Sequence, residues 1–226
     1  MLGAPPPHRQ KKAAMDHLKE PIATILAKFY AIKTPQPPED RLAALREQYN
    51  RCTQCPLATQ GRTRVVFGAG PATATLMIIG EAPGRDEDSQ GAPFVGRSGK
   101  LLTSMLASAG IDRSTIYISN VAKCRPPENR PPTPEESTTC MSHLLLKEIA
   151  IIKPDVICTL GATATSIFFD IKKGVSSKRG QFTQTEYFMI MPTYHPSYIL
   201  RSRSSAATVI DDFLKIRAFL EAKAKI

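Results

Sequence analysis

Apolar runs of strand length alternate along the chain with segments of helical spacing, and this alternation constrains the fold more than any other feature. The runs cover residues 75–79, 116–121, 155–160 and 187–191. Between them, apolar residues recur every three or four positions, most clearly over 97–109. Strands that alternate with helices form a parallel sheet covered on both faces. The pattern predicts an α/β fold, a three-layer α/β/α sandwich around a central, mainly parallel, four-stranded sheet.

The N-terminal part of the chain differs in composition from the remainder. Residues 1–12 are rich in proline and basic side chains, and residues 13–32 have helical spacing that is interrupted at Pro21. Further prolines form a linker to a second helix, which runs into the first cysteines. We expect residues 1–44 to be a partly disordered, helical extension and residues 45–226 to form one domain.

Charge limits the class of partner. Lysine and arginine outnumber aspartate and glutamate by 30 to 20, so the formal net charge is +10. A basic balance suits DNA or RNA, and it also suits an anionic membrane surface. No run of about 18 apolar residues is present, and the N-terminus lacks the apolar centre of a secretory signal. We expect no membrane span, and a cytoplasmic protein that acts as a monomer.

The five cysteines form a pattern that favours metal binding over disulfides, because no export signal is present. Cys52 and Cys55 make a C-x2-C pair, and Cys124 and Cys140 follow later in the chain. Four thiolates can hold either zinc or an iron–sulfur cluster. The spacing alone does not decide between zinc and an iron–sulfur cluster. It also allows a third interpretation, in which the four cysteines are unrelated. Cys158 lies inside an apolar run and is expected in the core.

Three loops leave the carboxyl ends of the predicted strands, after Gly80, at Asn120 and around His195. In open parallel sheets, ligands bind beyond those ends. Asn120 is either a turn residue or a polar reader with one acceptor and two donors on a short stem. Pro196 disfavours helical geometry at His195, which predicts an extended loop there. A lone histidine is more often structural, but His195 follows a predicted strand, in a loop at the same edge of the sheet as the other two loops.

The first of these loops combines backbone flexibility with acidic and aromatic side chains. Its segment GEAPG can expose N–H groups to an anion or to the polar edge of a base. Four carboxylates crowd this loop. Either they form a solvated acidic turn, or one of them orients a water molecule. Phe94 is either a stacking platform or a core residue. The carboxylates are Glu81, Asp86, Glu87 and Asp88.

Taken together, these segments resemble the family 4 uracil-DNA glycosylases. The matching motifs are GEAPG, GAPFVGRSGKLL, NVAKCRPPENRPPTPEE, LGATA and HPSYILR, and the resemblance runs from about Leu45 to the end. A similar pattern occurs in the amino-terminal segment of some phage-type DNA polymerases. The resemblance implies a DNA repair enzyme that flips uracil out of single- or double-stranded DNA. It would hydrolyse the N-glycosidic bond and leave an abasic site.

The resemblance also implies roles for individual residues. Phe94 would stack on the flipped uracil, Asn120 would read its O4 and N3–H, and His195 would donate to O2. The loop of Gly80, Glu81 and Ala82 would line the pocket. The four paired cysteines would hold a [4Fe–4S] cluster, namely Cys52, Cys55, Cys124 and Cys140. Candidate phosphate contacts are Lys178, Arg179, Arg201 and Arg203.

Some positions depart from related patterns and leave alternatives open. Ala82 stands where the family 1 enzymes have a water-activating aspartate, so Glu81 and Glu87 are the candidates for orienting water. The stretch 175–180 has no histidine to trap the sugar covalently, which favours turnover. The alternative functions are a non-catalytic, cluster-bearing nucleic-acid-binding module, a glycosylase with a wider range of deaminated bases, and an iron–sulfur electron-transfer protein.

Overall fold

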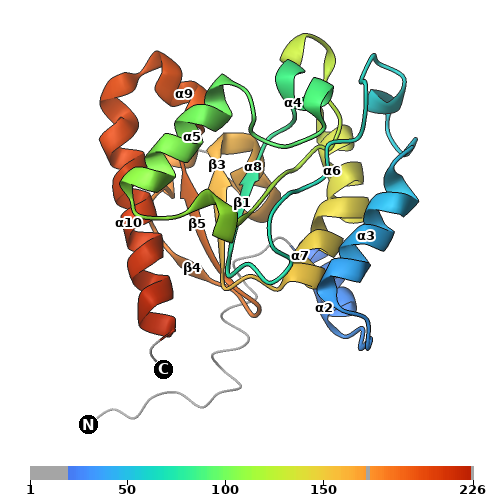
Figure 1. The fold of residues 1–226 in the computed structure, drawn as a ribbon, viewed down its shortest axis with the longest axis horizontal. Helices are drawn as coiled ribbons and strands as arrows, with labels where there is room; N and C mark the ends of the chain where they lie inside the picture. The colour runs from blue at the N-terminus through green and yellow to red at the C-terminus, as the bar shows by residue number, and fades with distance from the viewer. Residues whose placement is uncertain (1–19, 172–173, 225–226) are drawn as a thin grey trace.

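The computed structural model describes residues 20–171 and 174–224, and a single sheet lies at its centre (Figure 1). The strand order is β2-β1-β3-β5-β4, and all pairs are parallel except β4 with β5. The predicted α/β/α architecture is confirmed, but the sheet has five strands among the described residues where four were predicted. The strand bounds are Leu76–Gly80 (β1), Tyr117–Asn120 (β2), Val156–Leu160 (β3), Thr183–Gln184 (β4) and Met189–Thr193 (β5).

The additional strand is β4, an antiparallel edge strand of two residues. Thr183 is partly buried and Gln184 is exposed. Both side chains are polar, so β4 does not appear as an apolar run in the sequence. The prediction missed β4 because a strand this short leaves no periodic signal in the sequence.

Helices cover both faces of the sheet (Figure 1). On one face α5, α9 and α10 pack together, and on the other α2, α3, α7 and α8 do. A π-helical turn over Met141–Leu145 joins α6 to α7. The helix bounds are Glu20–Tyr30 (α2), Pro38–Tyr49 (α3), Arg85–Gln90 (α4), Arg97–Ser108 (α5), Pro134–Cys140 (α6), Leu146–Ile152 (α7), Gly161–Phe168 (α8), Pro196–Arg201 (α9) and Ala206–Lys223 (α10).

The core is divided by the sheet into two apolar layers. Met77 and Ile79 of β1 pack in the layer of α2, α3 and α7, whereas Leu76 and Ile78 pack in the layer of α5 and α10. Both faces of β1 are therefore buried, which is why the strand reads as a continuous apolar run. Cys158 of β3 is fully buried in the second layer, so its predicted core position is confirmed.

The N-terminal helices contribute to this core. Pro21 is the second described residue of α2, and the predicted interruption there stays a prediction because the preceding residues lie outside the described ranges. Leu26 of α2 is fully buried, and Leu42 and Leu45 of α3 pack in the same layer. The predicted disorder of residues 1–12 falls outside the described residues, and the boundary at residue 44 stays a prediction.

The carboxyl ends of β1, β2 and β5 open at the same edge of the sheet. Gly80 is paired with Asn120 in the parallel register, and β5 leads directly to the loop of His195. Within the part of the chain that the structure describes, no helix is long and apolar enough to cross a membrane. The three predicted loops thus lie together at one edge.

The burial of α2 leads to a stability prediction. We expect Leu26→Ala to lower the free energy of unfolding by about 2–5 kcal/mol, because it leaves a cavity in the core. Ile32 follows α2 and is 55% exposed, so Ile32→Ala should change this free energy by less than about 0.5 kcal/mol. Urea denaturation followed by circular dichroism measures both values. Equal effects of the two variants would contradict the packing of α2 on the domain.

Candidate active site

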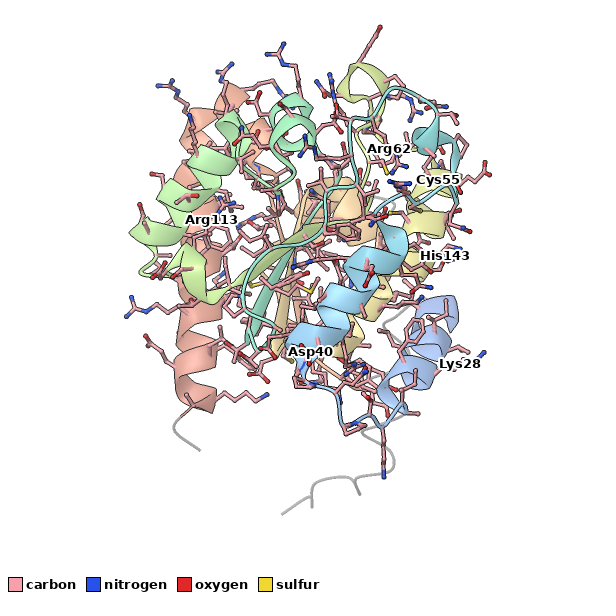
Figure 2. The ribbon with its side chains drawn as sticks, turned by 45° about the vertical axis from the view of Figure 1, so that its right-hand side comes forward. Lys28, Asp40, Cys55, Arg62, Arg113 and His143 are labelled. Carbon is pink, nitrogen blue, oxygen red and sulfur yellow. The ribbon has the colours of Figure 1, made fainter. Side chains whose placement is uncertain are left out.

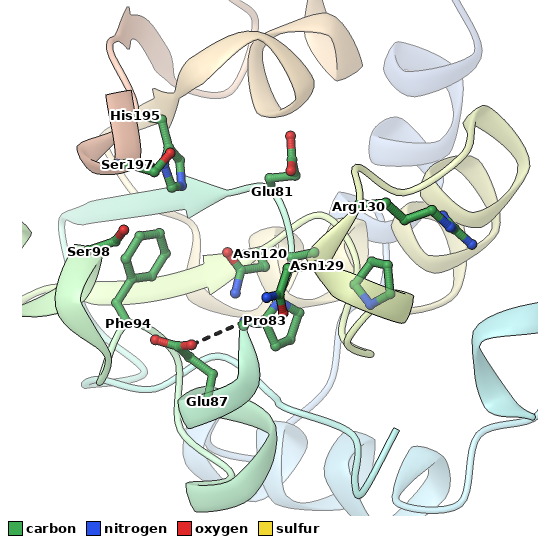
Figure 3. Close-up of a pocket in the computed structure, with 13 residues that line it drawn as sticks. Glu81, Pro83, Glu87, Phe94, Ser98, Asn120, Asn129, Arg130, His195 and Ser197 are labelled. Carbon is green, nitrogen blue, oxygen red and sulfur yellow. Dashed lines mark hydrogen bonds between the residues drawn. The ribbon is translucent and has the colours of Figure 1, made fainter. Parts of the chain in front are cut away.

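A cavity of about 320 Å³ opens at the carboxyl edge of the sheet. Figure 3 shows that Phe94, Asn120 and His195, which come from different segments of the chain, line it together. Glu81 and Glu87 also line it, from the loop after β1 and from α4. Ala82 lies on its wall as well. The structure therefore brings together six of the side chains that sequence analysis placed at one site.

Gly80 forms the base of this arrangement at the end of β1. A Cβ atom added there would lie 2.4 Å from Cζ of Phe94 and 2.5 Å from Oδ1 of Asn120. Both distances are far below van der Waals contact. Glycine is therefore required here for the ring and the carboxamide to approach the strand.

Phe94 is held in an unusual backbone conformation. Its φ angle is +55°, which is uncommon for a residue with a side chain and is found mostly at functional sites. Its carbonyl group approaches Gly99 so closely that a Cβ on Gly99 would lie 1.9 Å from the oxygen. The Arg113 guanidinium donates to the carbonyl of Pro93 at 2.9 Å and to that of Gly99 at 3.3 Å. These contacts hold the ring 5.8 Å from the His195 ring, centroid to centroid.

Glu87 fastens the segment after Phe94 to the loop after β1. Its Oε1 accepts from the N–H groups of Val95 at 3.0 Å and Gly96 at 2.8 Å, and its Oε2 accepts from Gly84 at 3.1 Å. Both carboxylate oxygens are thus engaged by backbone donors. Figure 3 shows the bond to Gly84 beside Pro83. This geometry favours a positioning role for Glu87 over the orientation of water.

Asn120 lines the cavity and carries an unsatisfied acceptor. The residue is 2% exposed, and its Oδ1 is buried with no hydrogen-bond donor among the described residues. Leaving a buried acceptor unpaired costs about 1–3 kcal/mol, and native structures rarely tolerate it without a reason. Because Asn120 lines the cavity, this oxygen suits a ligand that brings an N–H donor.

His195 caps the N-terminus of α9. Its Nδ1 accepts the backbone N–H of Ser197 at 3.1 Å and lies 2.8 Å from the Ser197 hydroxyl. Burial, together with the charge of Arg201, lowers the pKa of His195 to about 4, so the ring is neutral at pH 7. A backbone N–H can only donate, so the single ring proton lies on Nε2. The site therefore contains a neutral imidazole with one N–H donor.

Glu81 is the other carboxylate of the cavity. Thr163, from the first turn of α8, donates its hydroxyl proton to Oε2 of Glu81. Its second oxygen, Oε1, has no hydrogen-bond partner in the described part of the chain. Unlike Glu87, Glu81 therefore keeps an oxygen free for water or a ligand. The motif LGATA contained Thr163, but no sequence signal linked it to Glu81.

Comparison with known proteins identifies the architecture. The profile of the uracil DNA glycosylase superfamily matches residues 67–221. The chain belongs to this superfamily. Over 81% of its length it is 46% identical to the Type-4 uracil-DNA glycosylase of Thermotoga maritima, of which 96% is covered. Over 73% of its length it is 40% identical to that of Archaeoglobus fulgidus, of which 86% is covered.

More distant members of the superfamily also match. A DNA polymerase of Bacillus phage SP01 is 31% identical over 69% of this chain, which covers 17% of the polymerase. The Type-5 uracil-DNA glycosylase of Pyrobaculum aerophilum is 28% identical over 57% of this chain and 63% of its own length. The similarity to a phage polymerase agrees with the resemblance seen in the sequence motifs.

Four of the five cysteines of this superfamily member lie near one another. Cys52 and Cys55 are half-buried and pack against the cluster that contains Cys124, and Cys140 is buried at the end of α6. Burial raises the pKa of Cys124 to about 11 and that of Cys140 to about 12. Among the described residues, no three His, Cys, Asp or Glu side chains form a group that could hold a metal ion.

Two of the sulfur atoms accept hydrogen bonds. The Arg62 guanidinium donates to Sγ of Cys124 at 3.0 Å, and the backbone N–H of Lys123 donates to Sγ of Cys140 at 3.2 Å. Figure 2 shows Arg62 and Cys55 close together at the end of α3. N–H donors of this kind stabilise thiolate sulfur. The donor set is therefore one of sulfur atoms, two of which already accept an N–H hydrogen bond.

The basic residues predicted to contact phosphate do not form one group. Arg179 donates to both carboxylate oxygens of the buried Asp212, at 3.0 and 2.9 Å, which favours a structural role, and its phosphate contact stays a prediction. Lys178 places its ammonium 5.3 Å from the centroid of the Phe169 ring. Arg201 and Arg203 are exposed and have no ion pair with any described residue. No sequence signal linked Arg179 to Asp212, because the two residues are 33 positions apart.

A second hollow of about 300 Å³ adjoins the cavity and was missed at the sequence level. Arg85, Arg97 and Arg125 line it, and no described carboxylate forms an ion pair with them. It shares Glu87 and Asn129 with the cavity, so the two spaces are contiguous. Arg97 and Arg125 belong to the motifs quoted above, but only the fold shows that they meet.

The contacts of Gly80 lead to a second prediction. We expect Gly80→Ala to reduce the release of uracil from DNA, the superfamily's characteristic reaction, by about a hundredfold or more, because Phe94 or Asn120 must move away. A single-turnover assay on a uracil-containing oligonucleotide measures this rate. The thermal unfolding midpoint serves as a control for general damage. A variant with the normal rate would show that the close approach at Gly80 is not needed.

Proposed function

We propose that this protein is a DNA repair glycosylase that hydrolyses the N-glycosidic bond of deoxyuridine in DNA and leaves an abasic site. The observation that carries the proposal is the unpaired, buried Oδ1 of Asn120 at a cavity that Asn120, Phe94 and His195 line together. The similarity to Type-4 uracil-DNA glycosylases supports it. The substrate class is DNA because the chain is basic and its relatives are named for that substrate.

The cavity suits uracil better than cytosine. Oδ1 of Asn120 can accept from N3–H of uracil while Nδ2 donates to O4. Cytosine presents an amino donor and an N3 without a proton at the same positions, so both pairs fail. Each failed pair costs about 1–3 kcal/mol, which suffices for strong discrimination. Phe94 supplies an aromatic face on which the flipped base can stack.

Bond cleavage is assisted by the neutral imidazole of His195. As the N1–C1′ bond breaks, its electron pair passes to uracil and negative charge develops on O2. The Nε2–H of His195 donates to that oxygen, a stabilisation of about 3 kcal/mol for a single donor of this kind. The pKa of about 4 keeps the ring from becoming a general acid at pH 7, so its part is hydrogen bonding.

Water completes the reaction by adding its oxygen to C1′ and losing a proton. We assign its orientation to Glu81, whose Oε1 is free while Thr163 holds Oε2. Glu87 instead holds the segment after Phe94, because its oxygens are engaged by backbone N–H groups. Ala82 supplies no polar group to the cavity, so Glu81 takes the role in this chain.

The DNA strand would cross the edge of the sheet where its phosphates meet basic side chains. Lys178, Arg179, Arg201 and Arg203 remain predicted phosphate contacts on one side of the cavity. Arg85 and Arg97 line the adjoining hollow and extend the positive surface on the other side. A flipped nucleotide in the cavity would have its flanking phosphates within reach of both groups.

We further propose that Cys52, Cys55, Cys124 and Cys140 hold a [4Fe–4S] cluster. Four sulfur donors suit this group, and the N–H bonds to two of them support thiolate ligands. When bound, the cluster supplies a cross-link between the segment after α3 and the segment from β2 to α6. The cluster itself would not contact the base; Asn120, at the end of β2, would do so.

The excision proposal is tested with His195→Ala. We expect its rate of uracil release to fall about a hundredfold or more, with little change in affinity for DNA, because one transition-state donor is lost. His143→Ala is the matched control, since His143 lies against Tyr49, outside the cavity. Oligonucleotides with uracil in single strands, U·G and U·A pairs, and with hypoxanthine and T·G pairs define the substrates. Failure of the wild-type protein to release uracil would refute the proposal.

The cluster proposal is tested by metal analysis of the purified protein. We expect a brown protein that contains iron and acid-labile sulfide in equal amounts. Cys124→Ala should lose both and unfold at a lower temperature, whereas Cys158→Ala should retain them, because Cys158 lies in the core. A colourless wild-type protein with stoichiometric zinc would contradict this assignment.

A further inference from the structure

A fully buried ion pair lies directly behind the cavity and has no part in the reaction described above. Lys123 and Glu148 are 0% and 1% exposed, and Nζ of Lys123 lies 2.6 Å from Oε2 of Glu148. The ammonium also donates to Oγ of Ser119 and, at 2.8 Å, to the backbone carbonyl of Asn120. An ammonium has three N–H donors, so each is matched with one acceptor.

Glu148 connects this ammonium to three parts of the fold. Its Oε1 accepts from the N–H of Gly68 at 3.1 Å and from the hydroxyl of Tyr117 at 3.2 Å. Its Oε2 accepts from the hydroxyl of Ser119 at 2.8 Å. The network therefore joins β2, the segment before β1 and helix α7, and none of its charges faces solvent.

Stability alone does not account for such a pair. Desolvation of two charges offsets most of their attraction, and well-packed apolar side chains of similar volume often give equal or greater stability. A hydrogen-bonded ion pair differs from apolar packing in that it is directional and holds specific atoms in place. Here the atom held on the active-site side is the carbonyl oxygen of Asn120.

The carboxamide of Asn120 depends on its backbone for orientation. Its Oδ1 has no partner among the described residues, so no hydrogen bond to that oxygen aims the side chain before a base is bound. The backbone is held by pairing with Gly80, through the Val121 N–H to Gly80 carbonyl bond of 2.9 Å, and by the ammonium of Lys123. Ala122 continues the pairing with a 3.0 Å bond to the carbonyl of Glu81, so loss of the ammonium would release the carbonyl oxygen of Asn120 while the strand pairing stays in place.

We propose that Lys123 is a positioning residue for base recognition, which fixes the carbonyl of Asn120 so that its carboxamide meets the edge of uracil. This inference rests on the proposed function. Lys123 also donates its backbone N–H to Cys140, and its carbonyl accepts from Val66 at 2.7 Å. The same residue therefore ties the base-reading strand to the cysteine segment.

The test compares Lys123→Met/Glu148→Gln with the wild-type protein. The double substitution removes both charges at nearly constant volume, so no lone charge stays buried. Three quantities are measured below the unfolding temperature: the rate of uracil release, inhibition by free uracil, and affinity for DNA with an abasic site. We expect the first two to weaken about tenfold or more and the third to change less than twofold.

Two further variants separate positioning from general damage. Ile149→Ala destabilises the same helix without touching the network, and it should leave inhibition by free uracil unchanged. Asn120→Ala removes the reader itself, so adding the Lys123 and Glu148 substitutions to it should have no further effect on uracil release. If the double variant does not fold, Ser119→Ala replaces it, because it removes one acceptor of the Lys123 ammonium and leaves both charges paired; a smaller loss of uracil inhibition is then expected.

The outcomes distinguish this inference from the proposed function. If wild-type protein releases uracil but the charge-free variant retains normal inhibition by uracil, the positioning role is wrong and the function stands. Effects that are additive with Asn120→Ala, or equal to those of Ile149→Ala, would also overturn it. If wild-type protein releases no uracil, the proposed function itself fails.

Discussion

The close approach of two parallel strands at Gly80 is the constraint on which the site depends. Gly80 and Asn120 are paired at the ends of β1 and β2, and the Phe94 ring occupies the space that a side chain at residue 80 would take. Parallel pairing places both strand ends at one edge, and the missing Cβ lets an aromatic ring and a carboxamide share it. This contact sets one wall of the cavity, and the loops after β1 and β2 supply much of the rest.

A strained segment is stabilised around this contact by bonds from several elements. Phe94 adopts a positive φ, and the cost of about 1–3 kcal/mol must be offset by its surroundings. Glu87 accepts from the two backbone N–H groups that follow Phe94, and Arg113 donates to the carbonyl that precedes Phe94. Glu87 thus holds the backbone around Phe94, and its role differs in this from that of Glu81.

How far the sequence predicts this molecule depends on whether a feature is local. Strands buried on both faces produce apolar runs, and loops after such strands predict where Phe94, Asn120 and His195 meet. The two polar residues of β4 produce no such signal. The pairs Arg179–Asp212 and Lys123–Glu148 join residues 33 and 25 positions apart, so only the fold reveals them. The backbone partners of Glu87 could not be predicted either, because backbone N–H groups leave no trace in a sequence.

Electrostatics on the protein surface and inside the cavity follow different principles. The surface is basic, with a formal net charge of +10, and this suits long-range attraction of a polyanion. Inside, His195 is neutral because burial lowers its pKa, and the carboxylate of Glu87 accepts from three backbone N–H groups. Charge that develops on the base in the proposed reaction would therefore meet a fixed N–H donor rather than a mobile cation. Donors that are already oriented need no reorganisation as the bond breaks, which is how such a site lowers the barrier.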